Sequence, residues 1–78
     1  MKVVFTKHAA EMLSFRRIKK EFVEETVKNP DDTLEAKSGK MIYFKDFGKN
    51  FLKVVVAKED DKAVVITEHW IAKKRIKK

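Results

Sequence analysis

Two histidines, His8 and His69, are the side chains of this 78-residue chain that could exchange a proton near neutral pH. The ordinary pKa of histidine lies close to that range, so either imidazole could act as a general acid or base. Near His69 in the sequence stand Thr67 and, in two earlier strand-like runs, Lys45 and Lys53. Ammonium and hydroxyl groups beside an imidazole could hold an anion such as phosphate and shift the imidazole pKa.

Three apolar runs carry these side chains and predict how they are arranged. The runs cover residues 41–47, 51–58 and 63–70, and turn signals around Gly48 and at 59–62 separate them as in an antiparallel meander. Side chains alternate between the two faces of a strand. The fully apolar sets are expected beneath helices: Ile42, Phe44, Leu52, Val54, Val56, Val64 and Ile66. The mixed sets are expected on the opposite face, as the candidate site: Tyr43, Lys45, Lys53, Val55, Thr67 and His69.

The first half of the chain must supply the helices. Residues 2–5 are apolar enough for a first strand, and Thr6 is a suitable N-cap for a helix over 7–17. A second helix is expected over 20–28, ending before Pro30, and another strand over 33–37. The sequence therefore predicts an α+β fold. Two N-terminal helices pack on one face of a mostly antiparallel four- to five-stranded sheet, in the order β-α-α-β-β-β-β.

Positive charge is concentrated at the C-terminal end. The formal net charge is +7, and residues 71–78 carry five cations and no acid. Lys73, Lys74 and Arg75 could attract phosphates, and Arg16 could grip one with two hydrogen bonds. This basic tail predicts a polyanionic partner, nucleic acid first and an acidic protein second. The alternative is a solvated chain end that keeps the protein in solution.

Composition narrows the expected location, cofactors and oligomeric state of the protein. The chain has no cysteine, no visible leader and no apolar run long enough to span a bilayer, so a cytoplasmic location is expected. It has no glutamine and is rich in lysine and glutamate, which is typical of thermophile proteins. Two histidines without cysteine make a poor ligand set, so no metal or other cofactor is expected. We expect a single domain over residues 1–78, whose thin core a second copy could stabilise as a homodimer.

Motifs along nearly the whole chain resemble the DUF4258 family. In the first half these are Thr6-Lys7-His8-Ala9, Arg16-Arg17-Ile18 and Asn29-Pro30-Asp31. In the second half they are Tyr43-Phe44-Lys45-Asp46-Phe47-Gly48, Phe51-Leu52-Lys53-Val54-Val55-Val56 and Val65-Ile66-Thr67. The chain departs from the family pattern at Met12, where arginine is often found, and at Arg17, where glycine is common. The resemblance implies the fold of the RelE/ParE and BrnT toxins.

The resemblance also implies functions. RelE-like toxins are metal-independent ribonucleases that an antitoxin neutralises, whereas ParE-like members act on DNA gyrase. On the RelE-like interpretation, Lys45, Lys53 and Arg75 would hold the scissile phosphate of RNA, including mRNA on ribosomes. His69 or His8 would move protons, and an acidic antitoxin would be the partner.

Each candidate residue also has a structural interpretation. His8 could pack or cap its helix, and His69 could be an ordinary exposed strand residue. Tyr43 and Trp70 could stack on bases or belong to the core, and for Trp70 the alternation favours the core. A second function class therefore stays open: a non-catalytic domain of the same fold that binds nucleic acid or an acidic protein.

Overall fold

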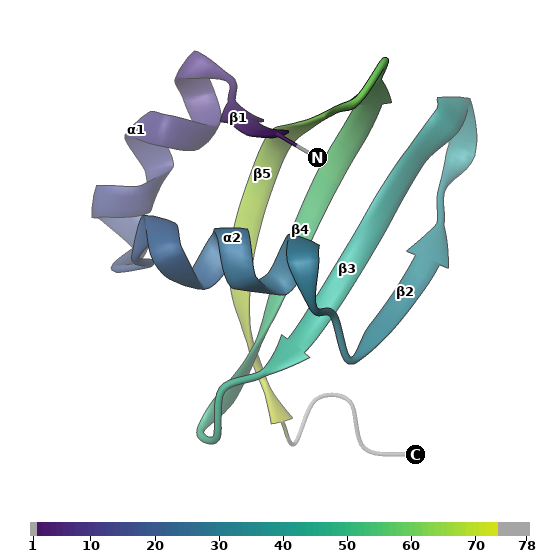
Figure 1. Cartoon of the computed structure of the whole chain (residues 1–78). Coiled ribbons are helices and arrows are strands. Elements are labelled where there is room, and N and C mark those ends of the chain that lie inside the picture. Colours follow the sequence, from purple (N-terminus) through teal and green to yellow (C-terminus); the bar gives the residue numbers. More distant parts are fainter. Residues whose placement is uncertain (1, 74–78) are drawn as a thin grey trace.

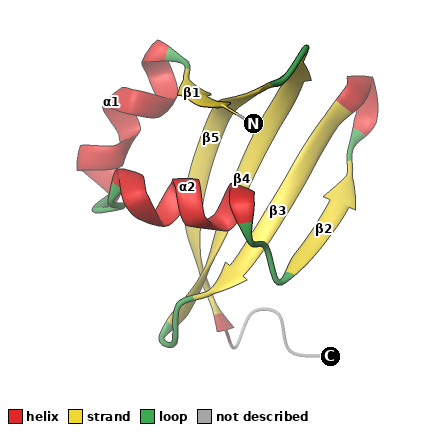
Figure 2. Cartoon of the chain, in the orientation of Figure 1, coloured by secondary structure: helices red, strands yellow, loops and turns green. Residues whose placement is uncertain are grey.

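A computed structural model describes residues 2–73, which form two helices on a five-stranded sheet (Figures 1 and 2). In chain order the elements are β1 (Lys2–Phe5), α1 (Lys7–Arg16), α2 (Lys20–Lys28), β2 (Asp32–Glu35), the short 3-10 helix η1 (Lys37–Gly39), β3 (Lys40–Asp46), β4 (Asn50–Glu59) and β5 (Lys62–Ala72). Both helices lie on the same face of the sheet, with α1 against β5 and β1 and α2 against β4 and β3. Neither helix in this part of the chain is long and apolar enough to cross a membrane.

The sheet is mixed, so the predicted mostly antiparallel sheet is wrong. The strand order is β1-β5-β4-β3-β2, and β1 pairs with β5 in parallel, with Lys2 opposite Lys62 and Phe5 opposite Val65. The other three pairings are antiparallel. The parallel pair joins the first and last of the described strands, which are far apart in the sequence and separated by both helices and three other strands. Alternation within a strand does not report the direction of so distant a partner, and this is why the sequence missed it.

Local hydrogen bonds explain where the helices begin and end. The Thr6 hydroxyl accepts from the Ala9 amide at 3.1 Å and caps α1. At the other end Arg17 adopts a left-handed conformation with φ 54°, and the amide of Ile18 donates to the Leu13 carbonyl at 2.9 Å. This is a Schellman-type end, which turns the chain sharply into α2.

The core lies between the helices and the sheet. Its buried apolar residues come from both helices, the connection between them and three strands: Ala9, Ile18, Val23, Val27, Tyr43, Leu52, Val54, Val56, Ala63 and Val65. An aromatic cluster closes one end of it. There Phe22 stacks on Phe47 at 4.6 Å between ring centroids, and Trp70 meets both edge-on.

The predicted face of β3 is wrong. Tyr43 is opposite Val54 and buried, so Met41, Tyr43 and Lys45 share the helix-covered face, while Ile42 and Phe44 lie on the other one. Both faces of this strand carry large apolar side chains, so the alternation fitted either assignment. The register with β4, which places Lys45 opposite Leu52, decides between them.

A β-bulge changes the alternation in β5. Val56 is opposite Val65, but Val55 is opposite Thr67, so Ile66 is an extra residue between the two pairs. As a result Val65 is buried in the core, where the sequence predicted Val64 and Ile66.

Candidate functional site

Three polar side chains gather on the face of the sheet that the helices leave uncovered, which we call the open face. His69 on β5 is directly opposite Lys53 on β4, and Thr67 lies two residues before His69 on the same side of β5. Directly opposed residues in an antiparallel pair have Cβ atoms about 5 Å apart, so an imidazole and an ammonium group stand side by side. All three side chains are partly exposed.

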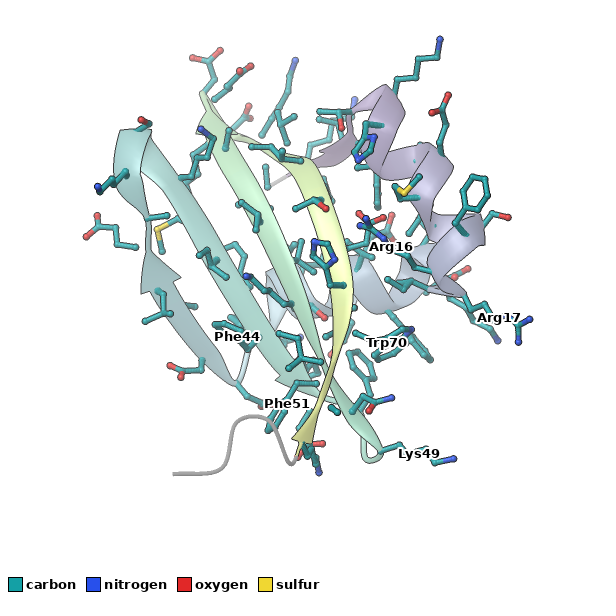
Figure 3. All side chains as sticks on the ribbon, turned by 180° about the vertical axis from the view of Figure 1, so that it is seen from behind. Arg16, Arg17, Phe44, Lys49, Phe51 and Trp70 are labelled. Carbon is teal, nitrogen blue, oxygen red and sulfur yellow. The ribbon has the colours of Figure 1, made fainter. Side chains whose placement is uncertain are left out.

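Arg16 joins this group from the end of α1. Its Nη1 donates to the Thr67 hydroxyl at 3.2 Å and to the Glu68 carbonyl at 3.0 Å. That carbonyl is accessible because β1 ends at Phe5, opposite Val65, and no strand among residues 2–73 lies beside the outer edge of β5 further along. Figure 3, which views the open face, shows Arg16 beside the edge of β5. The guanidinium therefore satisfies a carbonyl on the unpaired edge of β5 and also contacts Thr67 on the open face.

Thr67 connects Arg16 to His69. Its Oγ1 lies 3.1 Å from His69 Nε2. Arginine can only donate, so Thr67 Oγ1 accepts from Arg16 and keeps a second lone pair. In the tautomer with its proton on Nε2, His69 donates to that lone pair, and its Nδ1 is then an acceptor free of this contact. We call Arg16, Lys53, Thr67 and His69 the His69 cluster.

The electrostatics of the cluster favour a neutral imidazole. Partial burial lowers the pKa of His69 below its ordinary value of 6.5, and the positive charges of Arg16 and Lys53 lower it further. At neutral pH the ring is therefore mostly uncharged and can accept a proton.

Glu68 lies directly beneath the cluster, on the helix-covered face. It is fully buried, and neither carboxylate oxygen has a hydrogen-bond partner within the described residues. Burial raises its pKa to about 7, although the positive charge of Arg16 acts in the opposite direction. Sequence reasoning gave Glu68 no role. The available signal was a carboxylate in a row of otherwise apolar positions.

Two of the side chains predicted on the open face are not in the cluster. Tyr43 is buried in the core under α2, and Lys45 also faces the helices. The Lys45 ammonium donates to the Asn29 carbonyl at 2.8 Å and lies 4.0 Å from carboxylate oxygens of Glu25 and Asp31. It ties the end of α2 to β3, which is a structural role. The placement of both side chains on the open face is corrected.

The remaining candidates are spread over the molecule. His8 is exposed in the first turn of α1, eight residues or about 12 Å of helix from Arg16, so the structure does not bring it to His69. Lys73 follows β5; its ammonium pairs with Asp46 at 2.9 Å and lies 5.5 Å from the centre of the Phe51 ring. Lys74 and Arg75 lie outside the described residues. Within residues 2–73 no three His, Asp or Glu side chains are grouped as metal ligands would be.

Comparison with known proteins gives one match. The model of the family named "Domain of unknown function (DUF4258)" matches residues 5–67, which confirms the DUF4258 part of the resemblance. No curated protein and no solved structure matches the chain. Arg16, Lys53 and Thr67 fall inside the matched segment, whereas Glu68 and His69 follow it directly.

Proposed function

The chain belongs to the DUF4258 family, and from that premise and the His69 cluster we propose that it is a metal-independent endoribonuclease of the RelE-like toxin type. One observation carries the proposal. A neutral imidazole, oriented through Thr67 by an arginine, stands beside a lysine on an uncovered sheet face. These are the groups that RNA cleavage without a metal requires: a base, and cations for the phosphate.

Each member of the cluster has a distinct part in the proposed reaction. His69 Nδ1 accepts the proton of a ribose 2′-hydroxyl, and the 2′ oxygen forms a bond to the adjacent phosphorus. The bond from phosphorus to the 5′ oxygen breaks, and that oxygen takes a proton from water. The products are a 2′,3′-cyclic phosphate and a 5′-hydroxyl. Lys53 stabilises the charge that develops on the phosphate, and Thr67, whose Oγ1 lies 3.1 Å from Nε2, holds the imidazole in position.

The direct test is cleavage of an end-labelled RNA in the presence of a chelator, both free and on translating ribosomes. We expect the wild type to produce 2′,3′-cyclic phosphate ends. We expect His69→Ala to reduce the rate roughly a hundred- to ten-thousand-fold, which is the usual contribution of general base catalysis. His8→Ala is the matched control and should cleave at the wild-type rate. Intact RNA in both settings, or unchanged cleavage by His69→Ala, would contradict the proposal.

The proposed partner follows from the same hypothesis. An acidic antitoxin would neutralise the protein, in keeping with the net charge of +7. Induced expression in a bacterial host should then arrest growth, and co-expression of a neighbouring small acidic protein should restore it.

A non-catalytic nucleic-acid-binding domain is the second candidate function. It is favoured because Tyr43 and Lys45 lie on the helix-covered face. Fewer polar groups therefore surround His69 than the sequence predicted. Under this alternative the protein binds single-stranded RNA equally well with and without His69 and does not cleave it.

A further inference from the structure

The open face carries several apolar side chains that are partly or fully exposed to solvent. The partly exposed or exposed apolar side chains there come from four strands: Leu34, Ile42, Phe44, Phe51, Val55 and Ile71. Two of them are phenylalanines, and Figure 3 shows both on the side turned away from the helices. An aromatic ring left partly exposed in such a patch is available to a ligand.

Phe44 stands in the same row as the His69 cluster. In the register of the sheet Phe44 is opposite Lys53, and Lys53 is opposite His69, so ring, ammonium and imidazole follow one another across three strands. Neighbouring strands lie about 4.8 Å apart, so the whole row spans about 10 Å. A flat apolar ring and a phosphate-binding cation thus lie within the reach of one nucleotide.

Phe51 adds a second aromatic and cationic pair beside this row. It lies two residues before Lys53 on β4, on the same face of the sheet, and is opposite Ile71 on β5. The Lys73 ammonium lies 5.5 Å from the centre of its ring and is held there by the 2.9 Å ion pair with Asp46. Since Lys73 occupies the neighbourhood of that ring, Phe44 is the more accessible stacking surface of the two.

We propose that Phe44 is the base-stacking part of the site and that the open face takes single-stranded nucleic acid, with an unpaired base on Phe44 and its phosphate at Lys53. This deepens the proposed ribonuclease function, on which it rests for the identity of the substrate. Bases within a duplex are already stacked on one another, so only an unpaired base can lie on the ring. A sheet surface that presents aromatic rings is an established way to bind single strands.

Charge argues for this occupant over a second copy of the chain. On the open face Lys40 and Lys53 stand with Asp32 and Asp46, and Asp46 is paired with Lys73. The molecule as a whole carries +7, so two copies would repel each other, whereas a phosphate backbone would be attracted.

The test uses a fluorescently labelled 2′-deoxy oligonucleotide, which lacks the 2′-hydroxyl and cannot undergo the proposed cleavage. Its affinity is measured by anisotropy as a single strand and as a duplex, for the wild type and Phe44→Leu. We expect the single strand to bind more tightly than the duplex, and Phe44→Leu to weaken its binding about 5- to 100-fold, as for other stacked bases. Phe44→Tyr keeps a flat ring and should retain near-wild-type affinity.

Phe15 provides the matched control, because it is 80% exposed on α1 and outside the open face. Phe15→Leu should bind like the wild type, and circular dichroism should show that each variant is folded. Equal affinity for single strand and duplex, unchanged binding by Phe44→Leu, or self-association through this face in place of oligonucleotide binding would overturn the proposal.

The two proposals fail separately. Phe44-dependent binding of the deoxy strand without cleavage of RNA would remove the nuclease and leave the stacking site. Cleavage of RNA with the same KM in wild type and Phe44→Leu would remove the stacking site and leave the nuclease.

Discussion

Glu68 is the residue whose surroundings least resemble those of an ordinary surface carboxylate. Its side chain occupies space in the core behind β5, and its two oxygens lack hydrogen-bond partners within the described chain. An ionised carboxylate in that position has lost its hydration without replacing it. The raised pKa, about 7, expresses this cost: the folded protein holds the neutral acid up to a pH at which an unfolded chain is fully ionised.

This pKa predicts that stability depends on pH. Between the ordinary value of 4.5 and about 7, the folded state binds the Glu68 proton and the unfolded state releases it. The free energy of unfolding should therefore fall as pH rises through this range, by about 3 kcal/mol, and this contribution should level off above it. Glu68→Gln removes the ionisation and keeps the volume, so urea unfolding should show its advantage over wild type growing across that window.

An exposed glutamate supplies the control for this series. Glu11→Gln, on α1, should differ from wild type by the same small amount at every pH. If the difference between Glu68→Gln and wild type is also constant from pH 4 to pH 8, Glu68 is not protonated in the folded protein.

At the scale of elements, the strands show what alternation can and cannot determine. Alternation alone placed His69 and Lys53 together on the open face, although in β5 it put Val64 and Ile66 in the core where the structure has Val65. In β3 large apolar residues stand on both faces, and Tyr43 and Lys45 were assigned to the wrong one. Only the pairing of Lys45 with Leu52 distinguishes the two choices, and it depends on the geometry of the turn that joins β3 to β4. The Ile66 bulge has no evident sequence signal, since it lies within a continuous apolar run.

The end of α1 leads to a prediction about stability. Arg17 has φ 54°, a conformation that costs a residue with a side chain about 1–2 kcal/mol and costs glycine little. Part of the gain from glycine is offset by its greater freedom in the unfolded state. Arg17→Gly should therefore raise the free energy of unfolding by about 0.5 to 1 kcal/mol, measured by urea titration.

Arg17→Ala separates backbone strain from loss of the arginine side chain. It removes the guanidinium but retains a Cβ, so it should give no gain. The Trp70 indole donates to the Arg17 carbonyl at 3.2 Å in the native protein, a backbone contact that either variant can keep. Equal stability of the glycine and alanine variants would show that the helix end is not strained.

At the scale of the whole molecule, the first strand decides the shape of the site. β1 covers only the first four residues of β5 and leaves the rest of that edge to Arg16. Pairing between the two ends of a chain depends on tertiary packing and has no local sequence pattern, so neither the mixed sheet nor the position of Arg16 beside Thr67 could be predicted. The sequence therefore grouped Lys53, Thr67 and His69 in one site and named Arg16 only as a separate phosphate-binding candidate.

The asymmetry between the two faces of the sheet predicts how binding responds to salt. Lys53 lies on the open face, whereas the Lys45 ammonium is engaged with the Asn29 carbonyl under the helices. Each phosphate contact to a single strand contributes about 0.7 to the slope of log affinity against log salt concentration. Lys53→Gln should therefore weaken binding of the deoxy oligonucleotide and make this slope shallower by about 0.7 between 50 and 300 mM KCl, roughly one contact's worth. Lys45→Gln, the same substitution on the covered face, should leave the slope unchanged once thermal unfolding has shown that it is folded. Equal loss of slope in both variants would mean that nucleic acid responds to the net charge of the chain and not to the row that contains His69.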